Sequence, residues 1–511
     1  MAMSKSGTFS DVSSKPLSFK SEWAKERSVK AECTQTHTLE MKESEFQSFE
    51  RADYSCQTEQ ETVQFVATDW TKLNNFLTRV EPMICKALKQ NITSRAFEYY
   101  ENAFDSDSGS ISLTHSLKHV ALTQQIGGNQ TEEIQALTVA WNISGTTVAA
   151  SYGYSNHEDW CTHKGYVCTW NIERRSLNPA QADVSLDLDS CGTCLRFSPD
   201  QPGLLAVGNF NGEVMVFNLT YPSDNMMAAQ SKTSDAGHKE PISCLQWVKR
   251  KEAQEYQLVS CGYDGKILFW SLPARGKELT LRVSFLITAG SLPRELRGTA
   301  TTSTNRESGL SAVAFSRKEP DLFLATGETG AVLHCNVNTK NQHHSSSVPT
   351  DNPVYNPVVL GLKPHQGPVY SAEASPFHRN IVLTGGADGS VRVYSLLKLD
   401  PLVSCQLGGG LCYSVCWSPF RPMVFAASTS RGQILLFDLL HSQQLPHSRY
   451  VTEEGKPVFS LAFNPHKPHV LATADSQGVV KIWRLGHRYA TLTTNEEKKL
   501  MQLAHSSVEA V

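Results

Sequence analysis

Seven glycines, each standing five residues before an aromatic residue or a cysteine, are the feature that most limits how this chain can fold. They lie between short runs of alternating apolar and polar residues, the pattern of β-strands with one buried face. We expect each glycine to occupy a tight hairpin turn, where it reaches positive φ without strain. One such glycine carries no information, but seven in register indicate an internal repeat. The pairs are Gly165 and Trp170, Gly212 and Phe217, Gly265 and Trp270, Gly330 and Cys335, Gly389 and Tyr394, Gly432 and Phe437, and Gly478 and Trp483.

The clearest copy of the repeat runs from 367 to 396. It contains three alternating runs, separated by Ser375-Pro376-Phe377 and by Asp388-Gly389, and so predicts an antiparallel meander. A histidine, then Ser or Thr, then Asp-Gly, then an aromatic residue is the order typical of a WD-repeat propeller blade. We expect each such set to form a hydrogen-bonded tetrad whose histidine is structural and not catalytic. Two blades have the complete set: His238, Ser260, Asp264 and Trp270, and His365, Thr384, Asp388 and Tyr394.

The repeats predict an all-β, seven-bladed WD-repeat β-propeller at 136–490. A single blade cannot bury both faces, so neighbouring blades must cover them. The third and fourth intervals between the markers exceed a bare repeat of about 40–45 residues by the widest margin, which predicts solvated inserted loops at 273–308 and 338–363. The outermost strand of the last blade can come from the region before Leu137 or from 487–494, and the sequence allows both.

The first 66 residues have the composition of a disordered arm, rich in Ser, Thr, Lys and Glu and without periodicity. Two short islands in the arm, Thr34-Gln35-Thr36 and Cys56-Gln57-Thr58, alternate in a way that suits an extended strand. Such a segment can add to the exposed edge of a partner's sheet. The alternative is a polar linker in which Gln-Thr occurs twice by chance.

Residues 67–104 change to a helical period and predict an amphipathic helix. Thr68 or Asp69 can cap its first turn, and Pro82 should kink the helix or split it in two. The apolar stripe either packs on the side of the propeller or is buried by another subunit, and its distance from the first blade favours a partner. The stripe consists of Leu73, Phe76, Leu77, Val80, Ile84 and Leu88. The remaining segments are a linker at 105–135 and a C-terminal tail at 491–511.

Composition and motifs exclude several classes of function. The formal net charge of −3 and the short basic clusters argue against nucleic-acid binding, and no run of about 18 apolar residues is present for membrane insertion. Thirteen cysteines, scattered through the predicted strands, indicate buried reduced thiols. Cys191-x-x-Cys194 has no second pair nearby, so packing is a better interpretation than zinc or redox chemistry. No catalytic, cofactor or metal motif occurs in a confirming context, which predicts that the protein is not an enzyme.

Two of the repeats resemble repeats of dynein intermediate chains. The run Ser414-Val415-Cys416-Trp417-Ser418-Pro419-Phe420-Arg421-Pro422 is similar to one of them, and Gly367-Pro368-Val369-Tyr370-Ser371, with Pro376-Phe377 and Asn380, is similar to another. The order of arm, short helix and seven-bladed propeller also resembles this family, in particular the smaller intermediate chains of the dynein that drives retrograde intraflagellar transport. Intermediate chains of the general cytoplasmic dynein begin instead with a long coiled coil, and the arm here has no heptads.

The resemblance implies a non-catalytic subunit of a ciliary dynein, needed for cilium assembly. In the family, Thr-Gln-Thr motifs of the arm bind the dimeric eight-kilodalton dynein light chain. Thr34 to Thr36 match this motif, whereas Cys56 departs at the first position and leaves its light chain open.

Further partners implied by the family are a Roadblock-type light chain on the helix, a Tctex-type light chain, the heavy-chain tail on the propeller, and a second intermediate chain. The implied locations are the cytoplasm, the cytoskeleton, the cilium axoneme and the basal body or centrosome. The alternative is a substrate-receptor or scaffold propeller, for example of a ubiquitin ligase, but no adaptor-binding motif is recognisable.

Overall fold

The computed structural model describes residues 69–93, 111–120 and 134–505, with short gaps in the last range. The gaps are 158–159, 223–224, 233, 235, 251–254, 274–275, 294–295, 297–305, 340–352, 409, 443–445, 447, 453–454 and 494. The two predicted light-chain islands, Thr34–Thr36 and Cys56–Thr58, lie outside the described residues. The chain forms two units, Met1–Arg95 and Ala96–Val511.

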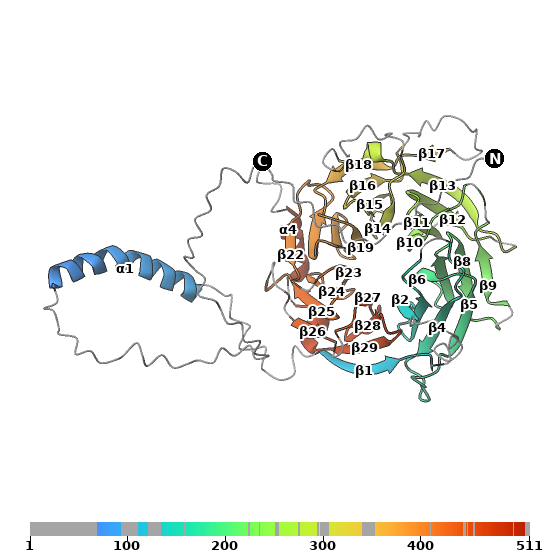
Figure 1. Ribbon diagram of the computed structural model, residues 1–511, viewed down its shortest axis with the longest axis horizontal. Coiled ribbons are helices and arrows are strands. Elements are labelled where there is room, and N and C mark those ends of the chain that lie inside the picture. The colour runs from blue at the N-terminus through green and yellow to red at the C-terminus, as the bar shows by residue number, and fades with distance from the viewer. Residues whose placement is uncertain are drawn as a thin grey trace, which may run out of the picture. The chain divides into compact units, whose positions relative to one another are not determined.

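Seven sheets form the second unit and stand side by side around a ring (Figure 1). Each is a blade built on four antiparallel strands, and the innermost strands of neighbouring blades contact one another. The prediction of an all-β, seven-bladed WD-repeat propeller is therefore confirmed.

Within each blade the strands follow sequence order from the channel outwards, except in the last blade. Blades one to three are β2 (Gln135–Trp141), β3 (Thr147–Gly153), β4 (Gly165–Asn171) and β5 (Val184–Leu188); β6 (Gly192–Phe197), β7 (Leu204–Asn209), β8 (Val214–Asn218) and β9 (Met227–Gln230); and β10 (Ile242–Lys249), β11 (Tyr256–Gly262), β12 (Lys266–Ser271) and β13 (Thr280–Leu286). Blades four and five are β14 (Leu310–Phe315), β15 (Leu322–Gly327), β16 (Val332–Asn336) and β18 (Val358–Leu362); and β19 (Val369–Ala374), β20 (Ile381–Gly386), β21 (Ser390–Ser395) and β22 (Val403–Gln406). Blades six and seven are β23 (Cys412–Trp417), β24 (Val424–Thr429), β25 (Gln433–Asp438) and β26 (Ser448–Val451); and β27 (Val458–Phe463), β28 (Val470–Asp475), β29 (Val480–Leu485) and β1 (Ile111–Leu117).

The hydrophobic core lies between the blades. Its seven main clusters each combine side chains of two neighbouring blades. Trp170 of blade one, for example, packs in one cluster with Ile482 of blade seven, and both are almost fully buried. Since burying one such side chain stabilises the fold by roughly 1.5–3 kcal/mol, an isolated blade loses most of its stabilisation.

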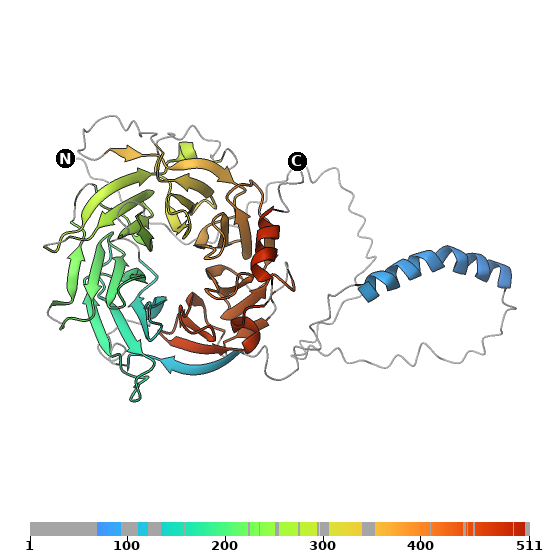
Figure 2. The same cartoon turned by 180° about the vertical axis from the view of Figure 1, so that it is seen from behind.

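The ring is closed by β1, which pairs antiparallel with β29 (Figures 1 and 2). Ile111 lies opposite Leu485 and Leu117 lies opposite Val480, and the Leu117 side chain is fully buried. Of the two sources left open by the sequence, the region before Leu137 supplies the strand. Residues 111–117 were expected in the linker at 105–135, and they belong to the propeller instead.

Residues 491–511 were expected to form a C-terminal tail. The structure instead has the short helix α3 (His487–Ala490) followed by α4 (Glu496–His505), which lies within that range. Leu500 and Ala504 of α4 are buried in the cluster between blades five and six. Arg421 is buried beneath the helix, where its Nη1 lies 3.1 Å from Asp438 Oδ2 and its Nη2 lies 2.6 Å from Glu496 Oε1. This helix is part of the propeller structure.

The inserted loops at 273–308 and 338–363 are not wholly solvated as expected. The first contains β13 and the turn η5 (Ala289–Ser291), and the second contains β17 (Val354–Tyr355) and β18. Strand β17 adds to β13 in parallel, and Phe285 of β13 is buried. Each marker residue lies on the third strand of its blade. The intervals after blades three and four therefore include the fourth strands β13 and β18, which made these intervals look like loop insertions.

Six of the seven marker glycines have positive φ, between 68° and 86°. Gly165 is the exception, because a long loop separates β3 from β4 and Gly165 begins β4. A Cβ atom at Gly165 would lie 2.4 Å from the Ser190 carbonyl oxygen. Glycine is needed there for close backbone approach, and not for a turn.

In the first unit, α1 (Trp70–Thr93) is one continuous helix that contains Pro82. Of the two outcomes expected at Pro82, a kink or a split, the split does not occur, and the helix axis bends in Figure 1. Asp69 caps the helix, since its Oδ1 accepts the backbone N–H groups of Thr71 (3.2 Å) and Lys72 (3.3 Å). None of the helices in the described ranges is long and apolar enough to cross a membrane.

Candidate functional site

The polar residues of blade three form a continuous relay. Trp270 Nε1 donates to Ser260 Oγ at 2.8 Å, and Ser260 Oγ lies 2.8 Å from His238 Nε2. His238 Nδ1 lies 3.0 Å from Asp264 Oδ1. With the serine hydroxyl donating to Nε2 and the Nδ1 proton donated to the carboxylate, a neutral imidazole satisfies every group. The relay ties together two strands of the blade, β11 and β12, the turn between them and the loop that precedes β10.

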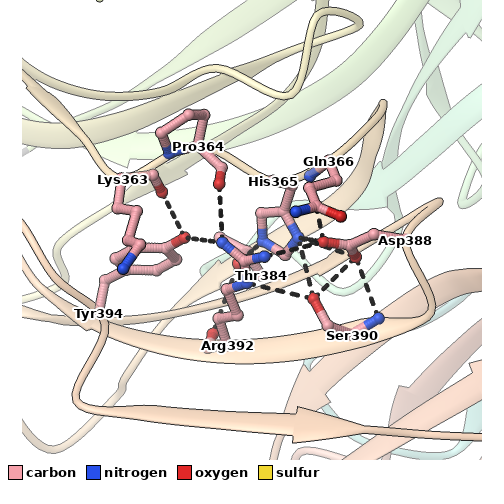
Figure 3. Close-up of polar contacts among 9 residues, drawn as sticks. All are labelled: Lys363, Pro364, His365, Gln366, Thr384, Asp388, Ser390, Arg392 and Tyr394. Atoms are coloured by element: carbon pink, nitrogen blue, oxygen red, sulfur yellow. Dashed lines mark hydrogen bonds and ion pairs between the residues drawn. The ribbon is translucent and has the colours of Figure 1, made fainter. Parts of the chain in front are cut away.

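Blade five is braced differently, as Figure 3 shows. His365 Nε2 lies 2.8 Å from Thr384 Oγ1, and His365 Nδ1 lies 3.1 Å from both carboxylate oxygens of Asp388. The Tyr394 hydroxyl donates to the Lys363 carbonyl oxygen at 2.7 Å rather than completing the tetrad at Thr384. Arg392, which the sequence pattern did not single out, joins the network with its Nη2 at 2.9 Å from Asp388 Oδ2.

The charge states of this network indicate a structural cluster. Burial lowers the pKa of His365 despite the opposing contact with Asp388, so the imidazole is neutral. Burial alone would raise the pKa of Asp388, but the hydrogen bonds from His365 and Ser390 lower it far below 3.8. The imidazole of His365, the carboxylate of Asp388 and the hydroxyls of Thr384 and Tyr394 thus have partners within the blade (Figure 3), and neither His365 nor Asp388 lines the central channel.

The central channel carries a regular feature of a different kind. In all seven blades the innermost strand has a shift of register near its start, after the first paired residue in blades two to seven and after the second in blade one, so one residue is bulged out of the ladder. A β-bulge re-aims its side chain, and here the bulged residues line a channel of about 360 Å³. In blade order they are Leu137, Thr193, Ser243, Ser311, Tyr370, Tyr413 and Phe459.

The bulged residues divide the channel wall into two halves. Blades five to seven contribute Tyr370, Tyr413 and Phe459, whose neighbouring ring centroids are 5.5 and 5.3 Å apart. Blades two and three contribute hydroxyls that bond to the next blade: Thr193 donates to Ile242 and Ser243 donates to Leu310. The hydroxyl half is therefore used within the fold, whereas the aromatic half presents partly exposed rings, a residue type enriched in protein interfaces. We call these three rings the aromatic arc.

The apolar stripe of α1 is exposed within its unit. Phe76, Leu77 and Ile84 are each 51% exposed, and Leu88 is 54% exposed. Leu73 is exposed to a lesser degree and Val80 is partly covered. A stripe of this length costs free energy when left in water, and large exposed apolar patches mark interaction sites.

Sequence reasoning missed the aromatic arc and Arg392. The register shifts that aim the arc into the channel depend on strand pairing, which a single sequence does not display. Arg392 alternates with apolar residues in its strand, a pattern that predicts a solvent-facing side chain and gives no sign of its contact with Asp388. Cys191 and Cys194, considered together in the sequence, diverge in the structure: Cys194 packs between blades two and three, and Cys191 packs in a small separate cluster.

Comparison with known proteins agrees with this geometry. The family model described as WD domain, G-beta repeat matches residues 230–271, 357–395 and 447–484. The last two matches begin with the outer strand of one blade and end with the third strand of the next. The fold and these matches define a WD-repeat propeller protein.

The family follows from the relatives. Cytoplasmic dynein 2 intermediate chain 2 of Mus musculus is 34% identical over 94% of this chain and 90% of its own length. Its Homo sapiens counterpart is 33% identical over 85% of this chain and 80% of its own length. Cytoplasmic dynein 1 intermediate chain of Drosophila melanogaster is more distant, at 22% identity over 74% of this chain. The chain belongs to the WD-repeat dynein intermediate chains.

Proposed function

We propose that this chain is a non-catalytic intermediate chain of the dynein that drives retrograde intraflagellar transport, and that it is needed for cilium assembly. The observation that carries the proposal is the 34% identity to a relative named for cytoplasmic dynein 2, which covers 94% of this chain and 90% of the relative. Residues from β1 to α4 make up a smaller share of the chain, so the similarity extends into the segment before the propeller. The relative named for dynein 1 aligns over only 52% of its own length.

The segment before the propeller is the proposed light-chain scaffold. The arm offers Thr34-Gln35-Thr36 to the dimeric eight-kilodalton light chain by strand addition, and Cys56-Gln57-Thr58 to the same or a Tctex-type light chain. Replacing Thr34, Gln35 and Thr36 with Ala in a peptide of residues 28–42 should abolish its heat of binding to the dimeric light chain. Unchanged affinity in calorimetry would disprove this site.

The stripe of α1 is the proposed site for a Roadblock-type light chain. It offers an apolar face that is exposed within its own unit. A second intermediate chain, held beside this one by shared light chains, completes the proposed scaffold.

The propeller is the proposed attachment site for the heavy-chain tail, and the aromatic arc is the part of it that we assign to the contact. The rings of Tyr370, Tyr413 and Phe459 are adjacent, and none of the three residues is fully buried. Changing Tyr370 and Tyr413 to Ser should weaken heavy-chain binding by tenfold or more, as expected when two aromatic anchors are lost. Changing Ser243 and Ser311 to Ala, at equivalent bulge positions, is the matched control and should leave binding intact.

The deciding experiment is purification of the tagged full-length chain from ciliated cells, followed by mass spectrometry. We expect dynein heavy chain, light chains and a second intermediate chain, with the tagged protein in the cytoplasm and in the cilium, at the axoneme and basal body. Recovery of cullin adaptors without dynein subunits would favour the alternative, a substrate-receptor propeller of a ubiquitin ligase. Loss of cilia on depletion, rescued by the wild-type chain, tests the requirement in cilium assembly.

A further inference from the structure

The loop between β3 and β4 of blade one differs from its counterparts in the other blades. Where they have a tight turn, blade one has the long connection from Tyr154 to Lys164. Cys161 in this loop is 2% exposed, and its backbone is held on both sides by Asn211, which accepts the Cys161 N–H and donates to the Cys161 carbonyl, both at 3.0 Å. The loop is thus fixed at one point in a buried environment.

Three side chains that bind metals meet at this point. They are His157 and Cys161 of the loop and Cys191 of the connection between β5 and β6, and their ligand atoms all lie within 4.8 Å of one another. His157 Nε2 is 3.0 Å from Cys161 Sγ, and Cys191 is fully buried. A tetrahedral zinc ion with Zn–S of about 2.3 Å and Zn–N of about 2.0–2.1 Å places such ligand atoms about 3.3–3.8 Å apart. The three atoms therefore need only small shifts to share one ion.

Backbone N–H groups orient both sulfur atoms, and burial raises the pKa of the Cys191 thiol to about 12, so a bound metal ion must displace its proton. Cys191 Sγ accepts the backbone N–H of Tyr154 at 3.3 Å, and Cys161 Sγ accepts the backbone N–H of Cys191 at 3.4 Å. Backbone N–H groups aimed at a ligand atom stabilise its negative charge and hold its orientation. The Cys161 thiol also reaches the His163 carbonyl oxygen at 3.6 Å, and a bound metal ion displaces that thiol proton.

A further nitrogen lies beside the three ligands. The ring centroid of His163 is 5.4 Å from that of His157, and the two rings meet edge to face. His163 Nδ1 is buried and has no hydrogen-bond partner among the described residues. A buried, unsatisfied imidazole nitrogen is costly. His163 is not in the group whose ligand atoms lie within 4.8 Å of one another, so its ring must shift to supply a fourth ligand. The His157 ring also stacks on Phe210, with ring centroids 4.1 Å apart, which helps to fix its orientation.

We propose that His157, Cys161 and Cys191 bind one structural zinc ion, with His163 adjacent to the fourth coordination position. Two thiolates and imidazole in a buried tetrahedral cage are the ligand set of structural zinc. The ion fastens the long loop of blade one to the start of blade two, in place of the hairpin turn that other blades use. Cys194, three residues after Cys191, points into another cluster and takes no part.

The test begins with the full-length chain, purified with a non-thiol reductant and without chelator, and measures zinc per chain. We expect one zinc per wild-type chain, and none above background for Cys161→Ser and Cys191→Ser. Cys194→Ser is the matched control, because it removes a neighbouring buried thiol and should retain the full zinc content. Melting temperatures establish that each variant is folded.

A second measurement on the wild-type protein keeps the test decisive if a variant fails to fold. Replacing zinc with cobalt should give the visible bands of a tetrahedral cobalt site and a thiolate-to-cobalt charge-transfer band. Zinc removal should also expose the chain to trypsin after Lys164, which is in the same loop. A folded wild-type chain that retains no zinc and gives no cobalt spectrum overturns the proposal, and so does a Cys161–Cys191 disulfide in the native protein.

Discussion

At the scale of single residues, buried charges and polar groups brace this propeller, and Arg421 is the largest of the charged ones. Arg421 is 1% exposed and binds Asp438 of β25 and Glu496 of α4. It lies in the run 414–422 that resembles the dynein family, and the structure explains what a cation does there: it joins blade six to the C-terminal helix. Its place in a Pro-rich turn predicted nothing of this, because both carboxylates are distant in sequence.

Removing the Arg421 cation should strongly lower the free energy of unfolding. Arg421→Met leaves two buried carboxylates without a counter-charge, and breaking a buried ion pair in this way costs about 3–5 kcal/mol. Urea denaturation monitors the free energy of unfolding, and trypsin cleavage at Lys498 and Lys499 monitors release of α4. The control is Arg379→Met, whose ion pair with Glu319 is exposed and should change stability by less than about 1 kcal/mol. Equal losses in both variants would contradict the assignment.

The His365 network makes stability depend on pH. The pKa of His365 in the folded state lies below its ordinary value of 6.5, so on acidification the unfolded chain takes up this proton first. Stability should therefore fall as pH drops below about 6.5, by at most about 1.4 kcal/mol per pH unit for one such group. The contribution of Asp388, whose pKa is lowered from 3.8, is present above that value and is lost only as pH falls below it.

The variant His365→Gln isolates the loss of stability below about pH 6.5 that we assign to His365. It should be less stable than the wild type at pH 7.5 and should lose less stability between pH 7 and pH 5, as measured by urea denaturation at each pH. His334 and His441 also have lowered pKa values and are retained in both proteins, so the difference between the two slopes reports on His365. Parallel slopes would show that His365 is not the titrating group.

At the scale of elements, the blades could be predicted from sequence because each carries its own marker glycine and alternating strands. Strand β1 could not be predicted in this way, because it carries no marker glycine and its partner β29 is at the other end of the chain. The ten-residue helix α4 was missed because only its buried side chains distinguish it from a polar tail. For the tetrads, the pattern anticipated the contacts of His365 but not the partner of the Tyr394 hydroxyl, which is set by where the preceding loop places a carbonyl group.

The α1 stripe gives the sharpest prediction for an element. Phe76→Asp with Val80→Asp puts two charges into the centre of the stripe, which an apolar interface accommodates only at high cost. The Roadblock-type light chain should be lost in co-purification, while the melting temperature of the propeller and heavy-chain binding stay unchanged. Asn75→Asp with Thr78→Asp adds the same charges to the opposite face of the helix and should retain the light chain. A large drop in the melting temperature of the Phe76/Val80 variant would instead indicate that the stripe packs on the blades.

At the scale of the whole molecule, stability depends on closing the ring. A chain that starts at residue 108 keeps β1, whereas one that starts at residue 121 loses it. The second should melt at a clearly lower temperature, since burial of Leu117 alone is worth roughly 1.5–3 kcal/mol, and β29 would become an unpaired edge prone to self-association. Calorimetry and light scattering on the two chains measure both effects. Identical melting curves would mean that β1 contributes nothing to closure.

The pairing of Leu117 with Val480 also sets an order of events during synthesis, because all the intervening blades must leave the ribosome between the two partners. β1 is among the first strands of the propeller to be made and has to wait, unpaired, until nearly the end of translation. Any chain that terminates early, even within the last blade, therefore releases a propeller with a permanently orphaned first strand. Such a product leaves backbone N–H and C=O groups unpaired at both open ends of the ring, where another chain can pair with them.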